Sequence, residues 1–378
     1  MTSLEFIVID IKTRKLLSLS GSFHVNSDTD RLYSNHQVGG RGLNSIEDIY
    51  ITRILAFAKH LKEIAGSNPY LRKVCEHEKD SLFRVERELT RSLELTTKED
   101  DTPKTISVRT KQRLKDLHEE HWLQKKQHGY LFSKRKDVPD VNTGLTNAWH
   151  KNSNFSSHVH GFLCAIQEEE IETRHLRYKR AEEKNRTDPK CRLCHTTDET
   201  IHHIVACCPM LSASMYLPLR HDQVAKDVYR KLVNDNDDAK VPIRDVYSTD
   251  EQTIWWDQRV KTPCTLKHNK PDILLWNKTD KKCYIIDIVV GLDINVEKNC
   301  QLKHDNYFQL GAELKRIYSD YSFEVVPISL GATGLVTNSL TKNLKKIGIV
   351  NPTKLAKRLQ QKALVGTMKI VKSFTKSM

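Results

Sequence analysis

The sequence contains Lys270-Pro271-Asp272-Ile273-Leu274-Leu275-Trp276, followed closely by Tyr284-Ile285-Ile286-Asp287-Ile288-Val289-Val290, and these two segments are its most informative feature. Both segments are apolar runs, and the polar residues 277–282 between them are typical of a turn, so the stretch predicts a β-hairpin. If the chain reverses between Thr279 and Asp280, Asp272 lies directly opposite Asp287, about 5 Å away on the same face. A register shifted by one residue would send one carboxylate to the other face.

Two carboxylates among apolar side chains repel each other, and burial makes that repulsion more costly. A hard divalent cation such as Mg²⁺ relieves it, because carboxylate oxygens are its preferred ligands. We therefore predict that Asp272 and Asp287 bind Mg²⁺, in an arrangement that suggests phosphodiester cleavage. The alternative is that the two residues only end their strands.

The sequence has 378 residues and a formal net charge of +13. No segment is apolar for long enough to span a membrane, and the start does not resemble a signal peptide. We therefore expect a reducing compartment, in which nine cysteines suit metal binding and burial better than disulfides.

The C-terminal segment from Asn351 to Met378 contains seven Lys or Arg residues and no acidic residue. Such a segment indicates a polyanionic partner, with nucleic acid favoured over a membrane surface. The alternative is a helix that only aids solubility. We assign the nucleic-acid contacts of this segment to Lys354, Lys357, Arg358 and Lys362.

The pattern of apolar and polar residues predicts an α+β protein with a helical N-terminal half. The expected parts are a helical segment at 1–100, a basic helical region at 101–188, a zinc knuckle with its following helix at 189–235, a domain of short strands and helices at 241–350, and a basic tail at 351–378.

Within the helical half, Ser45–Ile64 is expected to be a helix that starts at Ser45, and residues 96–103 to be a linker. Aromatic and basic residues alternate between Lys104 and Lys136, which suits either base stacking on nucleic acid or a helix with its aromatics in a core. A further helix is expected at Val159–Arg186, with Glu168-Glu169-Glu170 on a solvated face.

Two further elements are expected after the cysteine-rich segment, a helix from about His221 to Asn234 and an acidic loop at Asn234–Asp238. Upstream, His158 and His160 are two residues apart and so do not share a helix face, and we expect no metal dyad there.

The cysteine-rich segment has the spacing C-x2-C-x8-H-x4-C if its ligands are Cys191, Cys194, His203 and Cys208. Using His202 with Cys207 gives an equally regular spacing, so the sequence leaves both pairs open. Three thiolates and one imidazole form a closed tetrahedral Zn²⁺ site, which is typical of a structural role. The alternative is buried free cysteines with surface histidines.

The knuckle followed by P-D-x14-D resembles the C-terminal part of non-LTR retrotransposon polyproteins, a reverse transcriptase family with a restriction-like endonuclease. The resemblance covers most of the sequence. It also includes Arg31-Leu32-Tyr33 with Gly39-Gly40-Arg41-Gly42-Leu43-Asn44-Ser45-Ile46-Glu47-Asp48, then Arg220-His221-Asp222-Gln223-Val224-Ala225, Asp257 after Trp255-Trp256, and Pro327-Ile328-Ser329-Leu330-Gly331-Ala332-Thr333-Gly334.

The resemblance implies a thumb-like segment at 1–100 and a restriction-endonuclease-like α/β core with a mixed sheet at 241–350. It places the family's zinc-binding histidine at His203. The polymerase palm motif is missing, so the resemblance implies a truncated product that cannot copy RNA by itself. A separate full-length element-encoded reverse transcriptase is a possible partner.

The family's nuclease lysine does not follow Asp287 by two residues, because Val289 stands there. The resemblance instead identifies it as Lys303, in the K-x3-Y pattern that ends at Tyr307, with Lys298 as the alternative. We expect Val296–Tyr321 to be a helix, which puts Lys303 and Tyr307 on one face. In this interpretation, Lys303 orients water or stabilises charge, and Tyr307 binds a phosphate oxygen.

The predicted function is a Mg²⁺-dependent endonuclease that nicks target DNA, with the zinc knuckle binding DNA or element RNA. A nuclear location follows from the DNA substrate. The alternative is an inactive truncated remnant that still binds nucleic acid, and a scaffold that binds only protein is a third interpretation.

Overall fold

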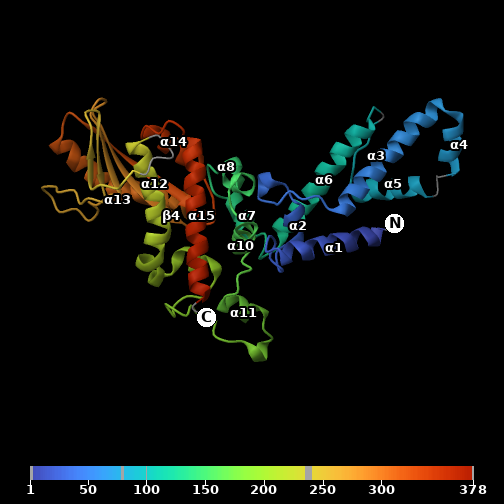
Figure 1. The fold of residues 1–378 in the computed structure, drawn as a ribbon, viewed down its shortest axis with the longest axis horizontal. Coiled ribbons are helices and arrows are strands. Elements are labelled where there is room, and N and C mark those ends of the chain that lie inside the picture. The colour runs from blue at the N-terminus through green and yellow to red at the C-terminus, as the bar shows by residue number, and fades with distance from the viewer. Residues whose placement is uncertain (1–2, 78–80, 99, 235–240, 377–378) are drawn as a thin grey trace. The chain divides into compact units, whose positions relative to one another are not determined.

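The computed structural model describes residues 3–77, 81–98, 100–234 and 241–376. The chain forms two compact units, Met1–Tyr130 and Leu131–Met378. The predicted α+β class is confirmed, because these described ranges contain helices in both units and one five-stranded sheet in the second (Figure 1). The acidic loop expected at Asn234–Asp238 lies outside the described residues, apart from Asn234.

The first unit is helical. Its helices are α1 (Ser3–Leu19), α2 (Thr29–Tyr33), α3 (Ile46–Ser67), α4 (Pro69–His77), α5 (Leu82–Ser92) and α6 (Pro103–Gln124), with a short 3-10 turn η1 (His36–Val38). The helix expected from Ser45 is confirmed as α3, because the Ser45 side chain accepts a hydrogen bond from the Asp48 backbone N–H. The Asp10 carboxylate accepts a second hydrogen bond at this helix start, from the Ile46 N–H.

The aromatic residues of the segment 104–136 divide between the two interpretations of that segment. Trp122 at the end of α6 is fully buried, and its indole N–H donates to the His128 carbonyl oxygen at 3.1 Å. Phe132 is also buried, on α7 (Tyr130–Lys136). These two rings pack inside the protein and are not available to stack on bases, whereas Tyr130 is exposed.

The second unit contains a sheet in the order β1-β2-β3-β4-β5. It is mixed, as the resemblance implies. Its strands are β1 (Val246–Ser248), β2 (Gln252–Trp256), β3 (Ile273–Asn277), β4 (Lys282–Gly291) and β5 (Ser322–Gly331). The first four strands pair antiparallel, and β5 pairs parallel to β4. A parallel pair needs a long crossover connection, and helix α13 (Val296–Ile317) provides it.

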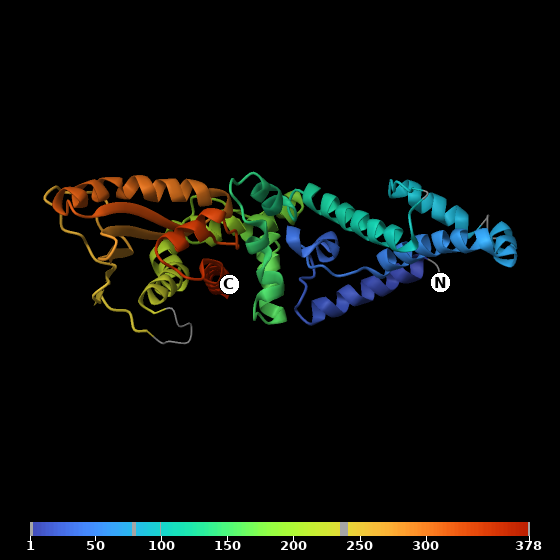
Figure 2. The same ribbon diagram turned by 90° about the horizontal axis from the view of Figure 1, so that it is seen from above.

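Side chains alternate across the sheet, so each face has its own core. One face of the sheet packs on α13 through Leu274, Cys283 and Ile285. The other face packs through Ile273 and Ile286 on α12 (Asp222–Val233), α14 (Asn338–Lys346) and α15 (Pro352–Lys376). Figure 2 shows α13 on one side of the strands and the other three helices on the opposite side.

The remaining elements of the second unit precede β1 in the chain, except η7, which follows β4. They are α8 (Thr143–Asn147), α9 (Trp149–Asn152), α10 (Ser157–Gln167), α11 (Arg174–Arg180), the 3-10 turns η3 (Glu183–Asn185), η5 (Pro209–Leu211) and η7 (Asp293–Asn295), and the π-helices η4 (His203–Cys207) and η6 (Ser212–His221). Among the described residues, no helix is both long and apolar enough to cross a membrane.

The single helix expected at Val159–Arg186 is wrong, because the chain forms α10 and α11 with a turn between them. Glu169 has a positive φ of 59°, and the Thr173 side chain caps the start of α11. The solvated glutamate face is also wrong, because Glu168 and Glu170 are buried and Glu170 pairs with Arg180 at 2.7 Å. The turn points these carboxylates inward, which a continuous surface helix would not do.

Helix α13 ends at Ile317, four residues before the expected end at Tyr321. The Lys315 ammonium group donates to the carbonyl oxygens of Ser319 and Tyr321, both at 2.8 Å. These bonds turn the chain into β5, which begins at Ser322.

Helix α15 contributes to two cores of the second unit. Leu355 and Leu359 pack in the core under the sheet. Ile370 and Phe374 pack in the core that contains Cys191. The basic tail expected at 351–378 is therefore, over its described length, a packed helix with charged residues on its outer side.

Candidate functional site

The hairpin of β3 and β4 has the register that the sequence predicted. Asn277 lies opposite Lys282 and Ile273 lies opposite Ile286, so Asp272, one residue before β3, lies at the level of Asp287. The Asp280 N–H donates to the Asn277 side-chain oxygen at 2.8 Å and closes the turn. Asp272 and Asp287 therefore belong to the sheet face that packs on α13.

Backbone hydrogen bonds fix both the carboxylate and the main chain of Asp272 at this position. Its Oδ2 atom accepts from the Ile288 N–H at 2.6 Å, directly beside Asp287. Its carbonyl oxygen accepts from the Asp257 N–H at 2.8 Å. Asp257 itself pairs with Lys270 at 2.9 Å. The start of β3 is thus held by hydrogen bonds from β4 and from Asp257, the residue after β2.

Asp287 is the most deeply placed acid of the site, with 3 % of its surface exposed. Burial raises the pKa of this carboxyl, and the negative charge of Asp272 raises it further. Lys303 opposes both effects, with its Nζ atom 2.5 Å from Oδ2 of Asp287, but the net shift of the pKa remains upward. A buried carboxyl next to a second acid favours the arrival of a cation.

Lys303 and Tyr307 both reach this site from α13, one turn apart, as expected. The Tyr307 hydroxyl donates to the Lys270 carbonyl oxygen at 2.9 Å and also interacts with Asp287. Burial and the charge of Asp287 raise the pKa of Tyr307, so the hydroxyl keeps its proton. Lys298 lies on the exposed surface of the same helix, and the geometry favours Lys303 over it.

His221 is a member of the site that the sequence interpretation did not assign. Its Nε2 atom lies 3.2 Å from Oδ2 of Asp272, and its Nδ1 atom lies 3.1 Å from Oδ1 of Asp222. Burial alone would lower the pKa of His221, but the carboxylates of Asp272 and Asp222 outweigh it and raise the pKa to about 9. The imidazole is therefore a cation at neutral pH.

Arg220 explains why His221 points at the sheet. Its guanidinium group is buried and donates to the carbonyl oxygens of Val205 at 2.8 Å and Val290 at 3.2 Å. These bonds fix the end of η6 against β4, one residue before His221. The tripeptide Arg220-His221-Asp222 stands out in the sequence as part of the resemblance. Only the fold reveals that its central residue, His221, contacts Asp272.

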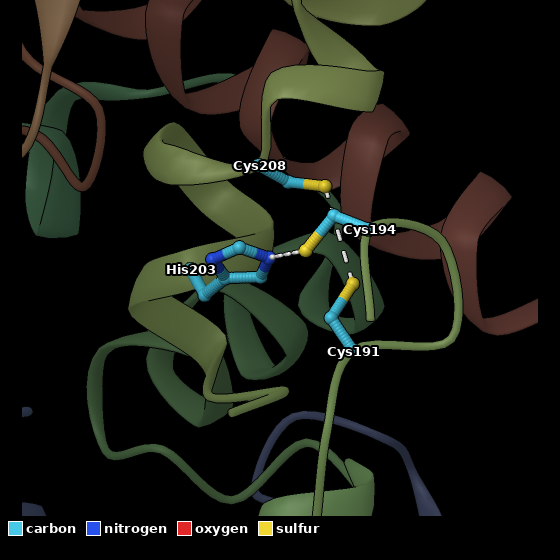
Figure 3. A group of neighbouring side chains, drawn as sticks. All are labelled: Cys191, Cys194, His203 and Cys208. Atoms are coloured by element: carbon cyan, nitrogen blue, oxygen red, sulfur yellow. Dashed lines mark hydrogen bonds between the residues drawn. The ribbon is translucent and has the colours of Figure 1, made fainter. Parts of the chain in front are cut away.

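The second site is the knuckle, in which the structure brings together Cys191, Cys194, His203 and Cys208. Their ligand atoms all lie within 4.8 Å of one another, and Figure 3 shows the side chains converging from the loop of Cys191 and Cys194, from η4 and from Cys208, which follows η4. Tetrahedral geometry with Zn–S of about 2.3 Å and Zn–N of about 2.0 Å gives S···S of about 3.8 Å and S···N of about 3.5 Å.

The observed separations agree with that geometry. The sulfur atoms of Cys191 and Cys208 are 3.9 Å apart, and the Cys194 sulfur lies 3.4 Å from Nε2 of His203. Three sulfurs and one imidazole nitrogen are the donor set of a closed structural site, so the cluster is compatible with Zn²⁺.

The structure distinguishes between the two pairs that the sequence left open. Residues 203–207 form a π-helix, and the Cys208 N–H donates to the His203 carbonyl oxygen at 2.9 Å across that turn. This bond places His203 and Cys208 on the same side. Cys207 is exposed, and His202 faces Glu169 at 3.6 Å, so neither belongs to the cluster.

The thiols of the knuckle differ in their acidity. The hydroxyl of Thr196 and the backbone N–H groups of Thr196 and Thr197 lower the pKa of Cys194 to about 5. Burial and the nearby charge of Cys191 raise the pKa of Cys208 to about 11. A bound cation would favour the thiolate form of both residues.

The basic residues assigned to nucleic acid all lie on α15, but they are not equally accessible. Lys354 is exposed, and Lys357 and Lys362 are half-buried. The Arg358 Nε atom lies 3.1 Å from Oδ2 of Asp227 on α12. Arg358 therefore links α15 to α12 through an ion pair.

In comparisons with known proteins, no family model and no curated protein matches this sequence.

Proposed function

We propose that this protein is a Mg²⁺-dependent endonuclease that nicks DNA, as the C-terminal fragment of a retrotransposon reverse transcriptase and endonuclease polyprotein. One observation carries the proposal. Asp272 and Asp287 lie at the same level of adjacent strands, and Lys303 contacts Asp287 at 2.5 Å from the helix that covers that face. Two acids and a lysine at one end of a sheet are the side chains that metal-assisted phosphodiester hydrolysis requires.

Each side chain has a distinct role in this proposal. Asp272 and Asp287 hold the ion, which when bound would lower the pKa of water and offset charge on the phosphate. Lys303 places a positive charge at the same point and stabilises the negative charge that grows on the phosphate during attack. Tyr307 and His221 keep the Asp287 and Asp272 carboxylates in position through the contacts described above.

The wider assignment rests on the same proposal and on the sequence resemblance. The knuckle and the lysines of α15 would hold target DNA or element RNA by backbone contacts, which position the substrate without reading its sequence. A full-length element-encoded reverse transcriptase would supply the missing polymerase, and the nucleus is the compartment that contains the substrate.

A plasmid-nicking assay with Mg²⁺ or EDTA tests the proposal. Wild-type protein should convert supercoiled plasmid to the open circle only with Mg²⁺. Asp272→Asn and Asp287→Asn should each lower the rate by roughly 100-fold or more while plasmid binding persists. Asp280→Asn in the exposed hairpin turn is the matched control and should nick normally. Equal nicking by Asp287→Asn and wild type would refute the assignment.

A second candidate is a nucleic-acid-binding protein without nuclease activity. One observation favours it, because Asp287 pairs with Lys303 and Asp272 pairs with His221, so both carboxylates have cationic partners without a metal. Plasmid binding in the complete absence of Mg²⁺-dependent nicking would support this candidate.

A further inference from the structure

We propose that His150, His160 and Cys164 form a second metal site, distinct from the knuckle, that binds one Zn²⁺ ion. The ligand atoms of these three side chains all lie within 4.8 Å of one another. Among the described residues, this cluster and the knuckle are the two groups of His, Cys and acidic side chains that converge in this way.

The local structure explains how the three residues meet. His160 and Cys164 are four residues apart on α10, so they share one face of that helix. The exposed residue His158 lies two positions before His160 and on a different face of the helix, so it lies outside this cluster. Helix α9 brings His150 to the same face from an earlier part of the chain.

The separation of the donor atoms supports a shared ion. The Cys164 sulfur lies 3.8 Å from Nδ1 of His160, close to the S···N separation of about 3.5 Å across a tetrahedral zinc site. The rings of His150 and His160 meet edge to face, with centroids 5.2 Å apart. Each of the three residues can therefore direct one donor atom to a common point.

The surroundings hold the rings in place. Trp149 is buried and stacks on His150 with centroids 4.0 Å apart, and it lies 4.7 Å from the ring of His160. Trp149 and Cys164 belong to the same apolar core as Cys191 and Cys208 of the knuckle. The proposed ion would join α9 to α10 within that core.

The donor set determines the chemistry. Two imidazole nitrogens and one thiolate suit a borderline ion such as Zn²⁺ rather than Mg²⁺, which prefers oxygen. Three protein ligands leave a fourth position for water or another small ligand, whereas the knuckle has four. Zinc should therefore leave this site more readily than it leaves the knuckle.

Zinc analysis of the full chain tests the proposal. Protein stripped of metal, refolded with excess Zn²⁺ and desalted should contain two zinc ions per chain, and a mild chelator should remove one before the other. His160→Asn and Cys164→Ser should each contain one, and His158→Asn, on the same helix, should contain two. A wild-type content of one zinc ion, or two ions in both His160→Asn and Cys164→Ser, would overturn the proposal.

Cobalt substitution distinguishes the loss of the second site from misfolding of a variant. Co²⁺ titrated into wild-type protein should give two phases of thiolate-to-metal absorbance, the stronger from the knuckle with its three thiolates. The weaker phase should be missing in Cys164→Ser while the stronger phase remains, which also shows that the knuckle is folded. A single phase in the wild-type protein would contradict a second site.

Discussion

The Lys303 ammonium group lies 2.5 Å from the Asp287 carboxylate, and this pair connects α13 to β4, an interior strand of the sheet. Lys303 is 27 % exposed at its side chain, whereas Asp287 is almost fully enclosed. Asp287 therefore relies on Lys303 to compensate its charge, whereas the charge of Lys303 is also solvated by water.

The first prediction concerns stability at Asp287. Its folded-state pKa lies above the ordinary value, so the native protein binds this proton more readily than the unfolded chain. The carboxyl therefore favours the fold in acid and costs stability as pH rises through the native pKa. In EDTA, Asp287→Asn should raise the thermal midpoint at pH 7 and lose that gain below about pH 4.

Thermal melts of Asp287→Asn at several pH values check this prediction, with Asp250→Asn in the exposed turn between β1 and β2 as a control. Lys303→Met should do the opposite at pH 7 and destabilise the fold by about 1–2 kcal/mol, because it leaves a buried acid without its cation. A lower midpoint for Asp287→Asn than for wild type would contradict the pKa direction.

The second prediction concerns His221, whose folded-state pKa is about 9 against an ordinary value of 6.5. A raised histidine pKa stabilises the fold fully below about pH 6.5, and this stabilisation is lost as pH rises through 9. The difference in unfolding free energy between wild type and His221→Gln should be on the order of 3 kcal/mol at pH 6 and shrink steadily toward pH 10.

Urea unfolding of His221→Gln and wild type across that pH range measures the difference. The exposed histidine variant His158→Gln serves as a control and should show little dependence on pH. A difference that stays constant from pH 6 to pH 10 would mean that His221 stabilises the fold by packing rather than by charge.

The third prediction separates the knuckle ligands from their neighbours. Cys208→Ser should lose the knuckle zinc and destabilise the chain by roughly 3 kcal/mol or more, because structural zinc contributes directly to folding. Cys207→Ser changes the exposed neighbour and should keep the metal. Zinc content and thermal midpoints test both variants, and the same contrast applies to His203→Asn and His202→Asn.

The fourth prediction concerns the lysines of α15. If Lys354, Lys357 and Lys362 each contact a DNA phosphate, replacing all three with Gln should reduce the slope of log affinity against log salt by nearly 3, at about 0.9 per contact. Arg358→Gln should mainly lower stability, because Arg358 pairs with Asp227. Fluorescence anisotropy at a series of salt concentrations measures the slope, and an unchanged slope would exclude these lysines.

Local sequence signals predicted the hairpin register well, because the six polar residues 277–282 allow the chain to reverse at their centre and a one-residue shift would bury the wrong face. The helix that carries Lys303 was equally predictable, since the periodicity of its residues and the need for a crossover connection both indicate a helix. Spacing alone could not choose between His202 and His203, because the choice depends on a π-turn that no simple period describes.

Burial of polar residues was the least predictable feature. Glu168 and Glu170 have the composition of a surface segment, and only the turn after α10 directs them inward. The burial of Trp122, whose ring lies under the Arg31 guanidinium, and the contact of His221 with Asp272 depend in the same way on residues distant in sequence. Such contacts follow from tertiary packing, which a single sequence does not encode in any local pattern.

Because α15 completes both the core under the sheet and the core around the knuckle, neither can close without it. A premature stop codon or frameshift upstream of residue 352 would leave two apolar surfaces open to solvent at once. Shortened translation products should therefore aggregate or be degraded instead of persisting as folded fragments.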